Sequence, residues 1–280
     1  MPEEIYPIRF EVPSSVLVTW ESWRGVGLPR LVNSTRYKIP HLEVVEPHKG
    51  RCVIVGGGPS VNAEFDNLKE IAEGSTVCSI NGAHNWLVKR GIIPDIHVVY
   101  DFDIENIEDC LDGPIHQDTI YYIGSHCHEN LYKQLEDYKV ILYHAYAIPE
   151  EYTNALNLLF PNEVKVGGGF LTLFRTIAIA KILGYRNFNL FGVDSSFEGE
   201  SSHVNGYTCA NKEKELQVWA RNQVTGELRQ FRTTAGLARQ ADCFPEFCRI
   251  HNELDIKIYG DGLLSYIHKT TNPMGIKSEC

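Results

Sequence analysis

The sequence predicts a Rossmann-like α/β fold, in which a mostly parallel sheet carries helices on both faces. The first observation is an apolar run at 52–55 that ends in Gly-Gly-Gly-Pro-Ser, residues 56–60, before a polar helical stretch that reaches about Ala72. The second is that strand and helix patterns keep alternating along the chain, which is typical of parallel sheets. The third is another glycine-rich turn at 165–170, followed by helical spacing over 171–183.

The remaining elements follow from short apolar runs and their glycine or proline boundaries. Strands are expected at 76–81, 97–100, 121–124, 140–144, 188–191 and 256–259. Helices are expected at 83–90, 131–138 and 235–252, with a short final helix after 260–264. Gly184 is a natural C-terminal stop for the helix at 171–183.

Three stretches lack a clear period. Residues 1–49 have scattered prolines and are predicted to be an irregular N-terminal lead packed on the core domain, which is expected to span 50–268. Residues 269–280 are expected to form a flexible tail. Residues 195–232 are polar and predict a long loop at the carboxyl edge of the sheet, where lids and binding loops usually lie.

Composition excludes several classes of protein. With 43% hydrophobic and 22% charged residues among 280, the chain is an ordinary globular sequence rather than a disordered or fibrous one. The formal net charge of -10 argues against a nucleic-acid partner. No leader peptide or membrane span is predicted, and the eight cysteines show no CxxC pair. These features favour a cytoplasmic protein with reduced thiols.

Ligands of open α/β sheets bind at the carboxyl ends of strands, so the residues just after strands are the candidates for nucleotide binding. They are Gly56, Gly57, Gly58, Pro59, Ser60, Asn81, Asp101, Gly167, Gly168, Gly169 and Thr172. The turn at 56–60 combines glycines with backbone N–H groups before a helix, an arrangement that suits a phosphate. It matches neither the Walker loop nor the full GxGxxG spacing, so a plain tight turn is the alternative interpretation.

Other side chains suggest catalysis or metal binding. Asp101 and Asp103 are spaced so that both carboxylates can reach one divalent cation on phosphate oxygens, although an acidic turn at a strand end explains them equally well. His203, nine residues after Asp194, lies in the polar stretch where an imidazole could take a proton from a hydroxyl; a surface histidine is the alternative. His126-Cys127-His128 is interpreted as a buried strand end rather than a metal site.

Taken in order, these motifs resemble the MptE-like domain family over roughly residues 50–268. The resemblance is carried by Cys52-Val-Ile-Val-Gly-Gly-Gly-Pro-Ser-Val, Ser79-Ile-Asn-Gly-Ala, Gly91-Ile-Ile-Pro-Asp95 with Asp101, Gly167-Gly-Gly-Phe-Leu-Thr, Ala180-Lys-Ile-Leu-Gly-Tyr and Leu190-Phe-Gly-Val-Asp194. The family includes 6-hydroxymethylpterin diphosphokinases and the motility-associated factor (Maf) glycosyltransferases. The layout is also similar to bacterial sialyltransferases that use CMP-sugars and a histidine base.

The two branches imply different reactions. Asp101-Phe-Asp103 looks like the acidic strand end of the diphosphokinases, which implies Mg²⁺ and ATP with a pterin-like alcohol. Gly192-Val-Asp194 followed by His203 looks like the glycosyltransferase segment, which implies His203 and Asp194 as catalytic residues. A nucleotide-sugar donor of the CMP-sugar type would then require no metal, and the acceptor would be a glycan, protein or small-molecule hydroxyl in glycan biosynthesis. A non-catalytic nucleotide-binding module is the third hypothesis.

Overall fold

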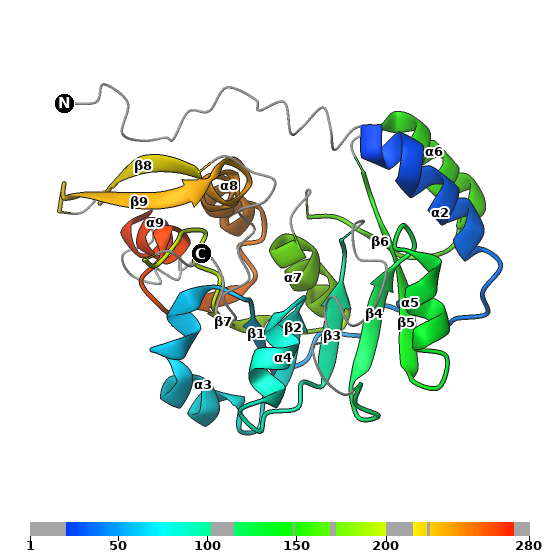
Figure 1. The fold of residues 1–280 in the computed structure, drawn as a ribbon, viewed down its shortest axis with the longest axis horizontal. Helices are drawn as coiled ribbons and strands as arrows, with labels where there is room; N and C mark the ends of the chain where they lie inside the picture. The colour runs from blue at the N-terminus through cyan, green and yellow to red at the C-terminus, as the bar shows by residue number, and fades with distance from the viewer. Residues whose placement is uncertain are drawn as a thin grey trace. The chain divides into compact units, whose positions relative to one another are not determined.

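The computed structural model describes residues 21–101, 115–147, 149–168, 172–199, 215–222 and 225–271 (Figure 1). Its strands form a two-stranded sheet, β8-β9, and an eight-stranded sheet in the order β10-β7-β1-β2-β3-β4-β5-β6. The described chain divides into two compact units, which we call unit 1 (residues 57–70 and 189–271) and unit 2 (residues 21–56 and 71–188, with the gaps given above). The predicted Rossmann-like α/β fold is confirmed. The limits predicted for the lead, the domain and the tail remain predictions.

Unit 2 contains a run of parallel strands. They are β1 (Arg51–Val55), β2 (Thr76–Ile80), β3 (Ile96–Val99), β4 (Ile120–Gly124), β5 (Lys139–Ala145) and β6 (Lys165–Val166). Each pairs in parallel with the next. Most strand residues are buried, as is usual for parallel strands covered on both faces. The apolar runs of the sequence therefore located β1 to β5 to within a residue or two.

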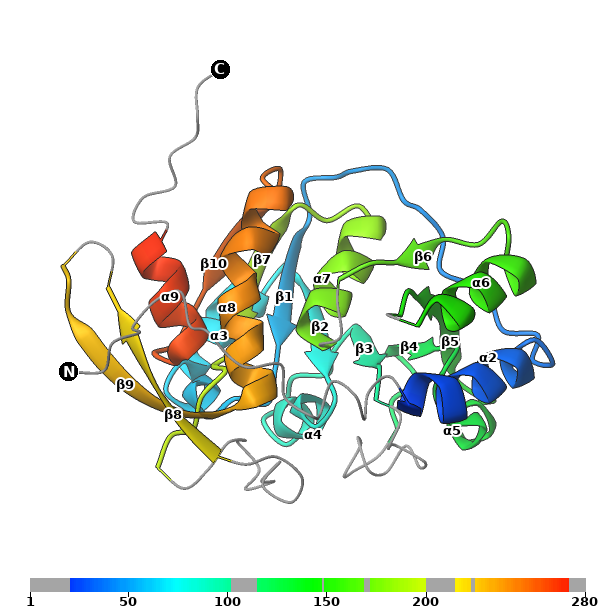
Figure 2. The same cartoon turned by 90° about the horizontal axis from the view of Figure 1, so that it is seen from above.

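The helices of unit 2 bury these strands. They are η1 (Trp23–Gly27), α2 (Leu28–Ser34), α4 (Ala83–Val88), α5 (Glu129–Gln134), α6 (Glu150–Leu159) and α7 (Thr172–Ile182). α7 packs on β1, β2 and β3, and α4 packs on β2. α2 contacts both α5 and α6, and the three helices gather beside β4 to β6 (Figure 2).

Unit 1 holds the rest of the described elements. They are η2 (Pro59–Asn62), α3 (Phe65–Ala72, whose last two residues belong to unit 2), β7 (Asn187–Phe191, whose first two residues belong to unit 2), β8 (Glu215–Arg221), β9 (Leu228–Thr234), α8 (Ala235–Ile250), β10 (Asp255–Ile258) and α9 (Leu263–Thr271). β8 and β9 form an antiparallel hairpin that contacts both α8 and α9 (Figure 1). The N–H of Tyr259 donates to Leu190 O at 2.9 Å, beside β7.

Two predictions about loops were wrong. The stretch 195–232 is not one long loop, because β8 and part of β9 lie within it. The sequence does not show a clear strand pattern here, because the buried apolar residues of these two strands are only Val218, Ala220 and Phe231, and most of their neighbours are polar. The stretch 1–49 is not wholly irregular, because η1 and α2 lie within it.

Two smaller features were also missed. α6 had no counterpart in the sequence prediction, and the pair of residues that forms β6 was interpreted as the start of a turn. Among the cysteines expected to be reduced, Cys52, Cys78 and Cys127 are free and buried in the core. In the ranges that the structure describes, no helix is long and apolar enough to cross a membrane.

Candidate functional site

The turn predicted to receive a phosphate uses its own N–H groups within unit 1. Gly58 donates its N–H to Gly192 O at 2.7 Å, and Ser60 donates its N–H to the Oδ2 of Asp194 at 2.9 Å. Pro59, between them, has no N–H to donate. The last three positions of the turn are therefore already engaged or lack a donor, which leaves Gly56 and Gly57 as the turn's remaining sources of backbone N–H. Phosphate binding here stays a prediction.

Asp194, a predicted catalytic residue, lies where only glycines leave it room. A Cβ added at Gly58 would lie 2.3 Å from Asp194 Oδ2, and one added at Gly262 would lie 2.6 Å from the Asp194 Cα. A Cβ at Gly260 would lie 2.3 Å from the Ser60 Oγ. Two glycine-containing segments, around residues 58–60 and 260–262, thus meet around one carboxylate that is only 5% exposed.

The environment of Asp194 raises the pKa of its carboxyl. Burial raises the pKa of this carboxyl above its ordinary value, and the negative charges of Glu198 and Asp261 add to the rise. Hydrogen bonding from Ser60 acts in the opposite direction on the pKa. The structure therefore places Asp194 as a buried hydrogen-bond acceptor of the glycine-rich turn. Its catalytic role stays a prediction.

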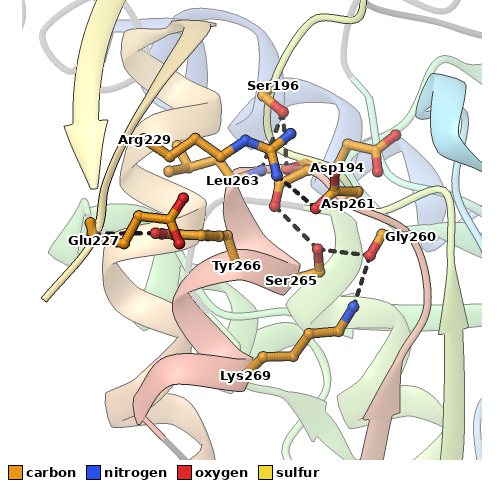
Figure 3. Close-up of polar contacts among 11 residues, drawn as sticks. Asp194, Ser196, Glu227, Arg229, Gly260, Asp261, Leu263, Ser265, Tyr266 and Lys269 are labelled. Carbon is orange, nitrogen blue, oxygen red and sulfur yellow. Dashed lines mark hydrogen bonds and ion pairs between the residues drawn. The ribbon is translucent and has the colours of Figure 1, made fainter. Parts of the chain in front are cut away.

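The segment 194–196 joins several parts of unit 1. Ser196 Oγ accepts the N–H of Leu263 at 3.1 Å, beside the start of α9 (Figure 3). Ser195 Oγ accepts from the Gln240 side chain of α8 at 2.8 Å. Ser195 has a φ of 56°, a left-handed conformation that non-glycine residues rarely adopt and that occurs often at functional sites. The hydrogen bonds from α8 to Ser195 and from α9 to Ser196 stabilise this strained backbone.

Figure 3 also shows how α9 is tied to its surroundings. Arg229 of β9 pairs with Asp261 at 2.6 Å, and the hydroxyl of Tyr266 donates to Glu227 O at 3.2 Å. Lys269 Nζ donates to Gly260 O at 2.9 Å. These contacts fix the segment 260–262 that packs against Asp194.

In unit 2, a set of residues lies just after the carboxyl ends of β2 to β6, where parallel strands meet one edge of the sheet. We call this set the carboxyl edge. Its members are Asn81 after β2, Tyr100 and Asp101 after β3, His126 after β4, Tyr146 after β5, and Gly167 and Gly168 after β6.

Asn81 has the features expected of a ligand-binding residue. Its φ of 44° is left-handed, and its backbone carbonyl accepts the N–H of His84 at 3.2 Å. The Asn81 Oδ1 atom is buried and has no hydrogen-bond partner among the described residues. A buried polar atom without a partner calls for an explanation, and a ligand or a water is the usual one. Nucleotide binding by Asn81 stays a prediction.

The other predicted residues divide between described and undescribed parts of the chain. Asp101 is exposed at the carboxyl edge, and Thr172 begins α7. Asp103, Gly169 and His203 lie outside the described residues. The two aspartates predicted as metal ligands therefore cannot be compared as a pair, and the metal site stays a prediction.

Arg175, in the first turn of α7, was missed by the sequence analysis. Its guanidinium donates to the carbonyls of Val166 and Tyr146 and lies 5.5 Å from the centre of the Tyr100 ring. The side chain is buried, with 3% exposure. The signal was visible in the sequence as one arginine among the apolar residues of the helix predicted at 171–183, since an apolar helix rarely buries an unpaired cation.

His126 and Cys127 are buried just after β4, which confirms the interpretation as a buried strand end for these two residues; His128 is partly buried and caps α5. His126 Nε2 forms a hydrogen bond with Tyr100 O at 2.6 Å. Burial lowers the pKa of His126 to about 3, with the nearby Arg175 and Arg30 acting in the same direction. Burial raises the pKa of the Cys127 thiol to about 12. Neither is charged near neutral pH.

With this geometry in hand, comparison with known proteins gives the family. The sequence matches the model of the MptE-like family, described as 6-hydroxymethylpterin diphosphokinase MptE-like, over residues 29–200. The chain belongs to the MptE-like family. No curated protein matches the sequence.

Two solved structures are similar to this MptE-like chain. A Maf glycosyltransferase from Magnetospirillum magneticum AMB-1 has a TM-score of 0.59 at 16% identity, over 90% of this chain and 41% of that one. The MptE-like chain thus spans less than half the length of that glycosyltransferase. A mammalian sialyltransferase in complex with Gal-beta-1-3GalNAc-ortho-nitrophenol has a TM-score of 0.43 at 10% identity, over 89% of this chain and 87% of that one. The likeness to the Maf glycosyltransferase shows the fold alone.

Proposed function

We propose that this MptE-like protein is a glycosyltransferase that moves a sugar from a nucleotide-sugar donor, of the CMP-sugar type, to a hydroxyl of a glycan or protein. The observation that carries the proposal is the carboxyl edge of unit 2. Asn81 there has a strained backbone and an unpartnered Oδ1, and the buried cation of Arg175 underlies the turn at Gly167 and Gly168. The likeness of the fold to a Maf glycosyltransferase supports it.

In the proposed reaction, an acceptor hydroxyl attacks the anomeric carbon of the donor sugar. The new bond forms between the hydroxyl oxygen and that carbon, while the bond from that carbon to the phosphate oxygen breaks. The nucleotide leaves with the bonding electron pair, and His203 takes the proton of the hydroxyl as general base. A CMP leaving group carries a single phosphate, so the electrostatics of this step do not require a metal ion.

Replacing His203 by Ala is expected to lower turnover by roughly a hundredfold or more, because a positioned general base contributes about that much. Nucleotide binding should stay within about twofold, since the base acts on the acceptor and not on the donor. Initial rates and a fluorescence titration with CMP measure the two effects. His48→Ala, at an exposed ring of unit 2, is the matched control. Unchanged turnover in His203→Ala would remove His203 from the mechanism.

A thermal-shift panel identifies the donor nucleotide, because a ligand that binds the folded state raises its melting temperature. The panel contains CMP, CDP, UDP, GDP and ATP, each with and without Mg²⁺. We expect the largest shift with CMP and no dependence of that shift on the metal. A shift with ATP alone, and only with Mg²⁺, would contradict the glycosyltransferase proposal.

The family description favours a second candidate, an ATP-dependent diphosphokinase acting on a pterin-like alcohol. Asp101 and Asp103 would then hold Mg²⁺ on the phosphates of ATP. Under this alternative, Asp101→Asn lowers turnover by at least about a hundredfold and EDTA abolishes it. Under the glycosyltransferase proposal, EDTA leaves turnover intact and Asp101→Asn lowers turnover by much less than a hundredfold. Asp118→Asn, at an exposed turn before β4, is the control. A protein that binds nucleotide but turns over no donor would fit a non-catalytic module.

A further inference from the structure

The guanidinium of Arg175 lies at the carboxyl ends of three parallel strands. It donates to Val166 O at the end of β6 and to Tyr146 O just after β5, and it lies over the ring of Tyr100 just after β3. In open α/β sheets, ligands bind outside this edge. The position of the cation therefore coincides with the place where a ligand is expected, and all the groups involved belong to unit 2.

The positive charge of Arg175 is not neutralised within the described residues. Arginine stays protonated in proteins. None of the carboxylates in the ranges that the structure describes forms an ion pair with it. The two carbonyls that it contacts carry partial charges only, and its buried Nε has no hydrogen-bond partner among the described residues. Since burying an uncompensated charge is costly, an anion that binds nearby would relieve that cost.

The turn above this cation has room for such a group. A Cβ added at Gly167 would meet no atom within 4 Å, so the chain is open on that side. Gly168, with a φ of 110°, lies so close to α7 that a Cβ there would approach Phe174 O to 2.8 Å. The turn is therefore open at Gly167 and packed on α7 at Gly168. Helix N-termini also favour anions, which adds to the field of Arg175 at this place.

We propose that Arg175 is the counter-charge for an anionic group, a phosphate or a sugar carboxylate, that binds at the turn of Gly167 and Gly168. This inference rests on the proposed function, in which the donor brings such a group. Arg175 is a positioning residue. It holds the backbone before the turn through Val166 and orients the anion through its field, which is strong because the surroundings are poorly solvated.

The test compares pairs of ligands that differ in one charge. Isothermal titration measures binding of CMP against cytidine, and of N-acetylneuraminic acid against its methyl ester. In the wild-type protein, we expect the charged member of at least one pair to bind about tenfold more tightly, a difference of about 1.4 kcal/mol. The CMP pair identifies a phosphate as the anion, and the sugar pair identifies a carboxylate. Competition by inorganic phosphate confirms the first source.

Two substitutions separate charge from structure. Arg175→Gln removes the charge, so the affinity of the charged ligand should exceed that of its neutral partner by no more than about twofold. Arg175→Lys keeps the charge and should keep most of the wild-type difference in affinity. Arg186→Gln is the matched control, because Arg186 also donates to two backbone carbonyls, those of Lys181 and Tyr185. It should leave the ratio unchanged.

Should Arg175→Gln fail to fold, the side-chain Nε–H resonance of Arg175 in ¹⁵N-arginine-labelled wild-type protein carries the test. It is assigned by its absence from Arg175→Lys, and it should shift on titration with inorganic phosphate or with the acid sugar. The inference is overturned if Arg175→Gln weakens binding of the charged and the neutral ligand equally. It is also overturned if the wild-type protein binds neither charged ligand more tightly than its neutral partner. Binding is measured without turnover, so loss of the glycosyltransferase proposal alone would leave these ratios in place.

Discussion

Acidification from pH 7 toward pH 4.5 is expected to destabilise the fold sharply, because three buried histidines stay neutral in the folded chain but bind protons when it unfolds. Burial lowers the pKa of His84 to about 4 and the pKa values of His126 and His144 to about 3. The three side chains are at most 1% exposed. In the unfolded chain, each imidazole has the ordinary pKa of about 6.5.

The direction follows from proton binding. Between pH 6.5 and about 4, the unfolded chain binds a proton at each of these imidazoles and the folded chain does not, so protons favour unfolding as the pH falls. The contribution of each histidine is fully present above pH 6.5 and is lost as the pH falls toward its folded pKa. At pH 5 the loss is about 2 kcal/mol for each, or about 6 kcal/mol together. That is comparable to the whole stability of a typical domain, about 5–15 kcal/mol.

Urea unfolding of the wild-type protein and of His144→Gln across pH 4.5 to 8 checks this prediction. His144 stacks on Phe160 with ring centres 4.0 Å apart, so the variant is expected to be less stable at pH 8. The difference should narrow by about 1.4 kcal/mol for each pH unit below 6.5, because glutamine cannot titrate. A difference that stays constant over this range would show that His144 is not held neutral by the fold.

Replacing Gly262 by Ala is the second change with a large expected effect. The added Cβ would lie 2.6 Å from the Cα, the Cβ and the backbone O of Asp194, closer than real Cβ atoms come to other atoms. Two of these three atoms belong to the backbone, so no side-chain rotation can relieve the contact. We expect a loss of about 3 kcal/mol of unfolding free energy, at the upper end of the usual cost of overpacking.

The same substitution at Gly25 is the matched control. A Cβ there would meet nothing within 4 Å, and Gly25 lies inside η1 without a positive φ. Alanine is the better helix former, so Gly25→Ala should be neutral or stabilising by up to about 1 kcal/mol. Urea unfolding monitored by circular dichroism measures both variants. A Gly262→Ala variant as stable as Gly25→Ala would contradict the close packing of residues 260–262 against Asp194.

The sequence predicted β1 to β5 well because each of these strands contains a short apolar run bounded by glycine, proline or a polar residue. Residues 52–55, for example, became all but the first residue of β1. The sequence prediction failed for β8 and β9, because few of their inward-facing side chains are apolar and the two strands pair mainly with each other. Such strands are stabilised by cross-strand contacts that a single stretch of sequence does not display.

For the site, the sequence by itself determined which residues follow strands, and so placed Asn81, Asp101 and the turn at Gly167 and Gly168 at one edge. Only the tertiary structure decided what those groups meet. Ser60 N–H is taken up by Asp194, and Arg175 is buried beneath Val166 and Tyr146. The positions of strands along the chain follow from the local apolar pattern, whereas the partner of a hydrogen bond or of a buried charge depends on residues far away in the sequence.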